Sequence, residues 1–117
     1  MEVESSTIEA TSRACSSDRQ QSVEIVVEGE TVVLRGMIET GSMNDALSLL
    51  IYTSLNENAE GIAIAEIQTF TTEETENDCR VETHYKSEIA FERKPTLLRV
   101  THYPHNGVPE RIDQFSV

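Results

Sequence analysis

Tryptophan is absent from this chain of 117 residues, and all aromatic side chains together make up only 5% of it. Its five glycines are scattered and form neither a Gly-x-Gly-x-x-Gly fingerprint nor a phosphate-binding loop. The two cysteines, Cys15 and Cys79, do not stand at a metal-ligand spacing. These absences argue against nucleotide hydrolysis, dinucleotide chemistry and the common zinc motifs, so we expect no cofactor.

Long hydrophobic runs are also missing. No apolar segment approaches the roughly 18 residues that a membrane-spanning helix needs. The first ten residues, MEVESSTIEA, lack the basic and apolar regions of a signal peptide. The expectation from these features is a soluble, cytoplasmic protein without membrane contacts, in which both cysteines are free thiols.

Basic residues are scarce, since 9 Lys and Arg stand against 21 Asp and Glu, for a net charge of −12. Such a surface disfavours direct nucleic-acid binding, which requires clustered cations to neutralise phosphates. It suits solubility, adaptation to salt, or a protein partner with a basic surface. The candidate contacts with such a partner lie in two acidic segments and are Glu57, Glu60, Glu73, Glu74, Glu76 and Asp78.

The sign of the charge reverses locally between residues 80 and 103, where five basic residues exceed three acidic ones. This layout predicts a mildly basic region on an acidic body. Pairing of these charges across neighbouring strands is the simplest interpretation. Orientation of a protein partner, or head-to-tail self-association, is the alternative.

Two β-branched runs within residues 22–38 flank Gly29-Glu30 and predict a β-hairpin. A two-residue turn there sets Val27 opposite Val32, and Ile25 opposite Leu34. The same register sets Glu24 opposite Arg35 as a pair of unlike charges on the other face.

Two further valines of this hairpin, Val26 and Val33, fall on that second, polar face. An apolar pair there predicts either a covering layer or a contact between subunits. Val26 and Val33 are therefore the candidate residues of a homo-oligomer interface.

The segment 42–55 carries apolar residues at helical spacing: Met43, Ala46, Leu47, Leu50, Ile51 and Leu55. Ser42 with Asp45 three residues later resembles a capping box, and Gly61 follows a polar ending. The pattern predicts one amphipathic helix with its stripe in the core.

Strand patterns follow at residues 61–72, 81–92 and 96–103. In the second, Val81, Thr83, Tyr85, Ser87, Ile89 and Phe91 alternate with charged side chains, so one face is buried and one is wet. The order is β-β-α-β-β-β. We therefore expect an α+β fold, a single small domain with an antiparallel sheet of about five strands backed by the helix.

The ends of the chain differ in composition from this domain, which we bound at residues 22–103. Residues 1–21 are polar and predict a flexible arm. Residues 104–117 contain two prolines and Asn106-Gly107 and predict an extended tail. Its apolar residues, Ile112, Phe115 and Val117, are expected to anchor it to the domain, and a free tail or a contact with another molecule are the alternatives.

Three histidines, His84, His102 and His105, form the most suggestive chemical cluster, since imidazoles close in space can bind zinc or exchange protons. Pairing of the last two predicted strands through residues 92–95 places His84 across from the other two. No catalytic residue is assigned, because carboxylates are so abundant here that no pair of them is informative.

The run VEIVVEGETVVLRGMIET followed by a predicted helix is similar to the central strand-strand-helix portion of BON domains. The resemblance covers about residues 22–60 and rests on the valine-rich hairpin with Gly29 and Gly36. The C-terminal strands depart from that family's pattern, so no function is carried over.

Together these features predict a small acidic binding or regulatory protein that acts through protein contacts rather than catalysis. Its sharpest form is an inhibitor or decoy that occupies the basic, nucleic-acid-binding site of another protein. The alternatives are a metal-binding or hydrolytic protein that uses the three histidines, and a homo-oligomeric structural subunit.

Overall fold

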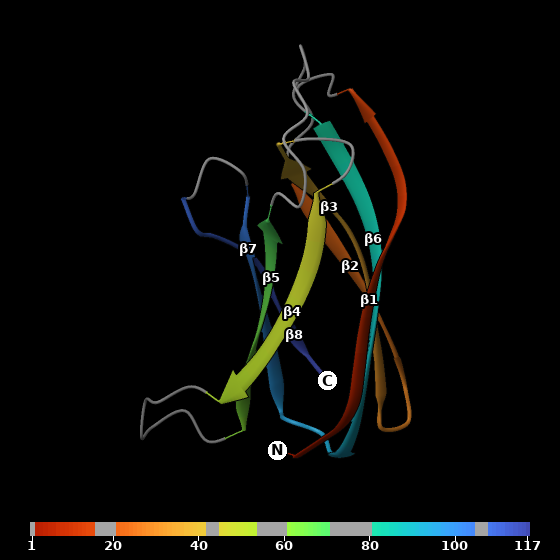
Figure 1. The fold of residues 1–117 in the computed structure, drawn as a ribbon. Coiled ribbons are helices and arrows are strands. Elements are labelled where there is room, and N and C mark those ends of the chain that lie inside the picture. The colour runs from red at the N-terminus through yellow and green to blue at the C-terminus, as the bar shows by residue number, and fades with distance from the viewer. Residues whose placement is uncertain (1, 16–20, 42–44, 54–60, 71–80, 105–107) are drawn as a thin grey trace.

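Two four-stranded β-sheets face each other in the computed structural model, which describes residues 2–15, 21–41, 45–53, 61–70, 81–104 and 108–117 (Figure 1). The strands are β1 (Glu2–Cys15), β2 (Ser22–Glu28), β3 (Thr31–Thr40), β4 (Ala46–Thr53), β5 (Ile62–Phe70), β6 (Val81–Arg93), β7 (Leu97–Tyr103) and β8 (Glu110–Ser116). Sheet A has the order β1-β6-β3-β2 and sheet B the order β4-β5-β7-β8. The fold is a β-sandwich.

The expected α+β class is therefore wrong, because the described residues contain strands and no helix. They accordingly include no helix that is long and apolar enough to cross a membrane. A second sheet takes the place of the helix predicted to back the first one.

The segment predicted as a helix forms β4, which pairs antiparallel with β5 from Ala46 opposite Phe70 to Thr53 opposite Ala63. A short apolar run such as ALSLLIYT satisfies both periods, and the sheet partner decides between them. The carboxylate of Asp45 accepts a 2.6 Å hydrogen bond from the Gly41 N–H, so this acid closes a turn rather than capping a helix. Ser42, Met43 and Leu55 lie outside the described residues.

The first hairpin forms in the predicted register. Val27 lies opposite Val32, Ile25 opposite Leu34, and Glu24 opposite Arg35. Gly29 has a φ of 61° in the turn, a conformation that suits glycine at a two-residue hairpin connection.

The alternation along β6 is confirmed for its inner face, since all six residues expected to face the core are buried, whereas Glu82 on the face expected to be wet is buried as well. This strand lies between β1 and β3 and pairs antiparallel with both. The expected pairing of the last two strands is wrong, because β6 and β7 belong to different sheets. Instead, β7 runs parallel to β5 and antiparallel to β8.

Both ends of the chain join the sandwich as edge strands. Residues 2–15, expected in a flexible arm, pair with β6 along its length, with three register shifts in the pairing. Residues 110–116 pair with β7, and Ile112, Phe115 and Val117 pack against the core as expected.

The state of the cysteines differs from the expected free thiols. Cys15, the last residue of β1, is disulfide-bonded. The sequence contains one other cysteine, Cys79, which lies outside the described residues.

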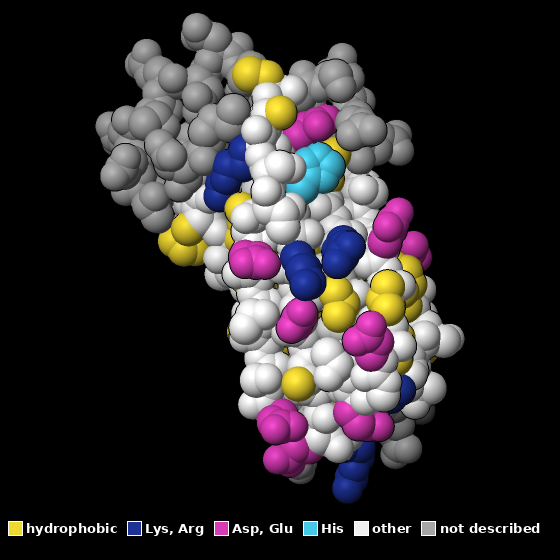
Figure 2. Space-filling view, turned by 90° about the vertical axis from the view of Figure 1, so that its right-hand side faces the viewer, with side chains coloured by type: hydrophobic (Ala, Val, Ile, Leu, Met, Phe, Trp, Pro, Cys, Tyr) yellow, Lys and Arg dark blue, Asp and Glu magenta, His cyan; other side chains and the backbone are white. Residues whose placement is uncertain are grey.

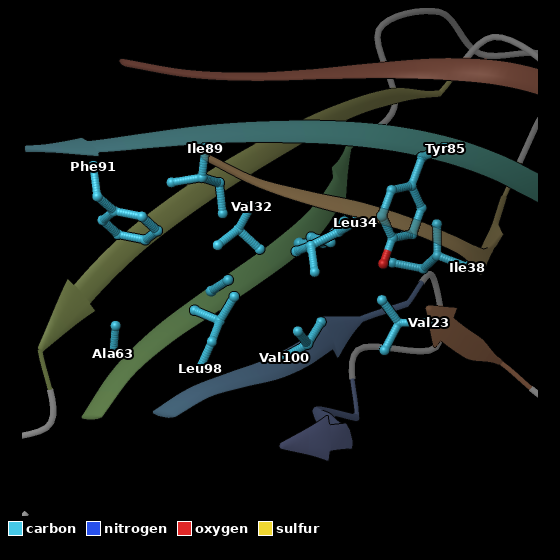
Figure 3. Packing of buried hydrophobic residues seen from close by; sticks show 12 residues of the cluster. Val23, Val32, Leu34, Ile38, Ala63, Tyr85, Ile89, Phe91, Leu98 and Val100 are labelled. Atoms are coloured by element: carbon cyan, nitrogen blue, oxygen red, sulfur yellow. The ribbon is translucent and has the colours of Figure 1, made fainter. Parts of the chain in front are cut away.

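The core fills the space between the sheets with aliphatic side chains and two aromatic rings (Figure 3). Its buried members are Val23, Val32, Leu34, Ile38, Ala63, Ala65, Ile67, Tyr85, Ile89, Phe91, Leu98 and Val100. Tyr85 lies opposite Gly36, and a Cβ at Gly36 would stand 2.6 Å from the Tyr85 hydroxyl and 2.5 Å from the Ser22 carbonyl oxygen. The missing side chain of Gly36 therefore makes room for the Tyr85 ring.

Substituting Gly36 tests this packing. Gly36→Ala is expected to lower the free energy of unfolding by about 2 kcal/mol, because an added methyl group must displace buried atoms. Gly29→Ala is the matched control, since its Cβ meets nothing within 4 Å and only the positive φ is strained, at about 1 kcal/mol. Urea unfolding measures the free energy of unfolding of both variants. Equal losses of stability would show that the Tyr85 ring does not need the space left by the missing side chain of Gly36.

Candidate functional site

The outer face of sheet A presents a row of charged side chains across its two central strands. Alternation sends Tyr85 of β6 into the core and its neighbours His84 and Lys86 outward. On β3, Arg35 points outward between the buried Leu34 and the inward-facing position of Gly36. The register places Arg35 directly opposite Lys86.

A depression of about 450 Å³ lies in the middle of this face. Its lining comes from all four strands of sheet A, and consists of Thr11, Ser22, Glu24, Arg35, Gly36, His84, Tyr85 and Lys86. Figure 2 shows two basic side chains side by side on this face with a histidine near them, and acidic side chains around the group. We call this depression the sheet A site.

Two cations directly opposite each other on adjacent strands repel, so this arrangement costs stability unless an anion lies between or beside them. Lys86 Nζ lies 3.2 Å from Glu88 Oε1, which compensates the lysine. Glu24 lies opposite Arg35 as predicted. Within the described part of the chain, however, no salt bridge of 4.0 Å or less joins Glu24 to Arg35.

The chemistry that this group offers is anion recognition. An arginine fork binds a carboxylate or phosphate through two parallel hydrogen bonds, and a neighbouring ammonium adds a second positive charge. The hydroxyls of Thr11 and Ser22 and the imidazole of His84 add polar atoms to the lining.

Glu57, Glu60, Glu73, Glu74, Glu76 and Asp78 all fall outside the described residues. Val26 and Val33 lie opposite each other on β2 and β3, and Val26 is 53% exposed. They remain candidate contacts.

The structure does not bring the two described histidines together. His84 lines the sheet A site, whereas His102 of β7 is fully buried between the sheets. Tyr85, which follows His84, points inward and meets His102, so the backbone of β6 separates the two imidazoles. His105 lies outside the described residues, among which no group of three or more potential metal ligands occurs.

His102 belongs instead to a buried polar network. Its Nε2 lies 2.7 Å from the Tyr85 hydroxyl, and its Nδ1 lies 3.3 Å from Oε1 of Gln21. A proton on Nδ1 satisfies both contacts, because the ring then donates to Gln21 and accepts from Tyr85. Burial lowers the pKa of His102 from 6.5 to about 4 and raises the pKa of Tyr85, so both groups are neutral near pH 7.

A second polar group lies on the outer face of sheet B, around Glu66 of β5. The carboxylate of Glu66 accepts hydrogen bonds from Tyr52 of β4, from Tyr103 of β7 at 3.2 Å, and from Gln68 at 3.3 Å. The hydrogen bond to Glu66 raises the pKa of Tyr52 to about 12, and the charge of Glu66 raises the pKa of Tyr103. With three donors this carboxylate is satisfied within the protein, so it ties three strands together.

Comparison with known proteins gives no further guide: no family model, no curated protein and no solved structure matches this chain.

The sequence predicts which residues of the sheet A site point outward, but it does not predict that they lie next to one another. His84 and Lys86 were expected on one wet face, and Arg35 on the outer face of the hairpin. The contact between β3 and β6 joins segments far apart in the chain, and no local pattern specifies it. The reversal of charge sign between residues 80 and 103 was the one signal available.

The buried imidazole makes stability depend on pH. In the unfolded chain His102 takes up a proton near pH 6.5, whereas the folded protein resists this until about pH 4. The unfolded state therefore binds more protons in this window, and the free energy of unfolding falls as the pH falls from 6.5 to 4, by roughly 3 kcal/mol at most.

Replacing His102 with Gln, which still accepts a hydrogen bond from Tyr85, is expected to flatten this slope. His84→Gln is the matched control because it removes an imidazole from the surface. Urea unfolding across this pH range measures both variants. The same slope in His102→Gln as in the wild type would contradict the buried neutral imidazole.

Proposed function

We propose that the protein is a non-catalytic binding protein that acts through protein contacts and recognises an anionic group of its partner at the sheet A site. The observation that carries this proposal is the pair Arg35 and Lys86, placed directly opposite each other at one depression. Glu88 already compensates Lys86, so the repulsion that remains in the free protein falls on Arg35, which forms no salt bridge with any described residue. A bound carboxylate offsets that repulsion.

The anion belongs to a protein rather than to a nucleic acid. A polyanion approaching this chain meets a net charge of −12, which repels it over a Debye length. A protein partner that is basic around a single carboxylate is attracted by the same net charge, although the carboxylate itself is negative. The acidic residues Glu57, Glu60, Glu73, Glu74, Glu76 and Asp78 stay the predicted contacts with that basic surface.

This combination retains the inhibitor or decoy hypothesis in a more specific form. The negative net charge attracts a basic site on the partner. The sheet A site then fixes the orientation of the partner by binding its one carboxylate. Long-range attraction raises the association rate, and the local pair sets the register.

A titration with small peptides tests the sheet A site. The probe is a capped Gly-Glu-Gly peptide, and a capped Gly-Gln-Gly peptide is its uncharged control. Nuclear magnetic resonance is expected to show shifts at Arg35, Lys86 and His84 with the glutamate peptide alone, weakening with added salt.

Arg35→Gln is expected to weaken this binding by about ten- to a hundredfold, the equivalent of one charge-assisted hydrogen-bonded contact. Arg99→Gln is the matched control, since the Arg99 guanidinium lies on sheet B and donates to Gln114 at 3.2 and 3.3 Å. Equal shifts with both peptides, or unchanged binding in Arg35→Gln, would remove the sheet A site from the account.

The disulfide bears on the compartment in which the protein acts. We propose an oxidising compartment in place of the expected cytoplasm, because disulfides persist there and are reduced in the cytosol. The support is the disulfide-bonded state of Cys15.

Mass spectrometry of the protein from its native source checks this compartment, after an alkylating reagent has been added to the denatured, unreduced protein at lysis so that every reactive thiol carries one label. We expect no reactive thiol per chain. Two reactive thiols per chain, one for each cysteine in the sequence, would restore the cytoplasmic expectation.

A further inference from the structure

One edge of the sandwich lacks the charges that protect the others. The edge strands are β1 and β2 in sheet A, and β4 and β8 in sheet B. Three of them carry several charged residues, namely Glu4, Glu9 and Arg13 on β1, Glu24 and Glu28 on β2, and Glu110, Arg111 and Asp113 on β8. Strand β4, with the sequence ALSLLIYT, carries none and contains neither proline nor glycine.

Edge strands expose unpaired backbone donors and acceptors, and proteins usually block them with charges, prolines or bulges. Strand β1 has bulges in addition to its charges. Strand β4 pairs with β5 without a register shift over its whole length. It is thus a regular strand, and none of these protections occurs along it.

The side chains of β4 are incompletely covered on both faces. On the outer face, Leu50 is 53% exposed and Tyr52 is 37% exposed. Phe70 of β5, opposite Ala46, adds a ring that is 50% exposed. On the inner face, Leu47, Leu49 and Ile51 pack against the core but are only partly buried. A strand added to this edge would cover apolar surface on both sides.

We propose that β4 pairs antiparallel with β4 of a second copy of this chain, so that two copies of sheet B form one continuous sheet. This interface goes beyond the proposed function and is separate from the sheet A site. Antiparallel pairing of identical strands about a twofold axis is self-complementary, since the same groups meet from both sides.

The charges of the edges favour a second copy at β4 in particular. Antiparallel pairing of β4 with itself opposes only Leu, Ile, Tyr, Ser, Thr and Ala, and no charge meets a charge. With Leu50 opposite Leu50 of the second copy, Ser48 meets Tyr52, and Leu49 meets Ile51. The same pairing at β2, centred on Val26, would oppose Glu24 to Glu28 and is disfavoured.

Salt affects this interface differently from an ionic one. Each copy carries a net charge of −12, so two copies repel each other while their contact itself is uncharged. Added salt screens the repulsion and is expected to strengthen the dimer, whereas it weakens binding of a carboxylate at the sheet A site.

Sedimentation equilibrium of the purified chain over a range of concentrations tests the proposal. The expected result is a mass that rises with concentration from 13.1 kDa toward twice that value, at lower concentration when salt is raised. A mass of 13.1 kDa at every concentration and salt level would overturn the proposal.

Leu50→Lys is expected to keep the chain monomeric, because two lysines would meet at the twofold axis. Val26→Lys is the matched control, since Val26 is also 53% exposed, and on an edge strand of the other sheet. Far-ultraviolet circular dichroism and cooperative thermal unfolding confirm that each variant is folded. If Leu50→Lys does not fold, Ser48→Lys places the charge on the same face.

The two variants distinguish an interface at β4 from an interface at Val26 and Val33. Loss of the dimer in Leu50→Lys alone supports β4. Loss in Val26→Lys alone would overturn the proposal and assign the contact to Val26 and Val33. A dimer that persists in both variants would also overturn the proposal. Peptide binding at the sheet A site is measured separately, so none of these three outcomes decides the proposed function.

Discussion

The inward row of side chains on β6 is the constraint from which the rest of the structure follows. Six alternating residues from Val81 to Phe91 are buried, and they fix which face of the strand meets the second sheet. A shift of one residue would bury the charged row instead. With β1 on one side and β3 on the other, β6 also sets the register of sheet A. The position of every outward side chain in that sheet depends on it.

Core and candidate site are two sides of this one strand. Tyr85 points inward, fits over Gly36 and meets His102 of the other sheet, which links the two layers through a buried polar contact. Its neighbours point outward, and Lys86 meets Arg35. The packing that positions the tyrosine therefore also holds the two cations together. The binding proposed at the outer face would use a geometry that the core has already determined.

The parts of this fold that sequence could predict are those in which neighbours in the chain are neighbours in space. The hairpin at Gly29 and the inner face of β6 are of this kind, and both are confirmed. The helix was wrong because ALSLLIYT fits either period, and its partner β5 decides the outcome. The parallel pairing of β5 with β7 and the meeting of Arg35 with Lys86 join distant segments, so no local pattern specified the two sheets or the site.

The conformation of residues 46–53 tests the central claim of an all-β sandwich most directly, because this segment also satisfies the period of a helix. Nuclear Overhauser effects on the labelled protein distinguish the two states. The sandwich predicts cross-strand contacts between the backbone of β4 and β5, such as Leu50 with Glu66. A continuous series of amide-to-amide contacts along residues 46–53, without these cross-strand contacts, would show a helix. It would contradict the second sheet and with it the unprotected edge of β4.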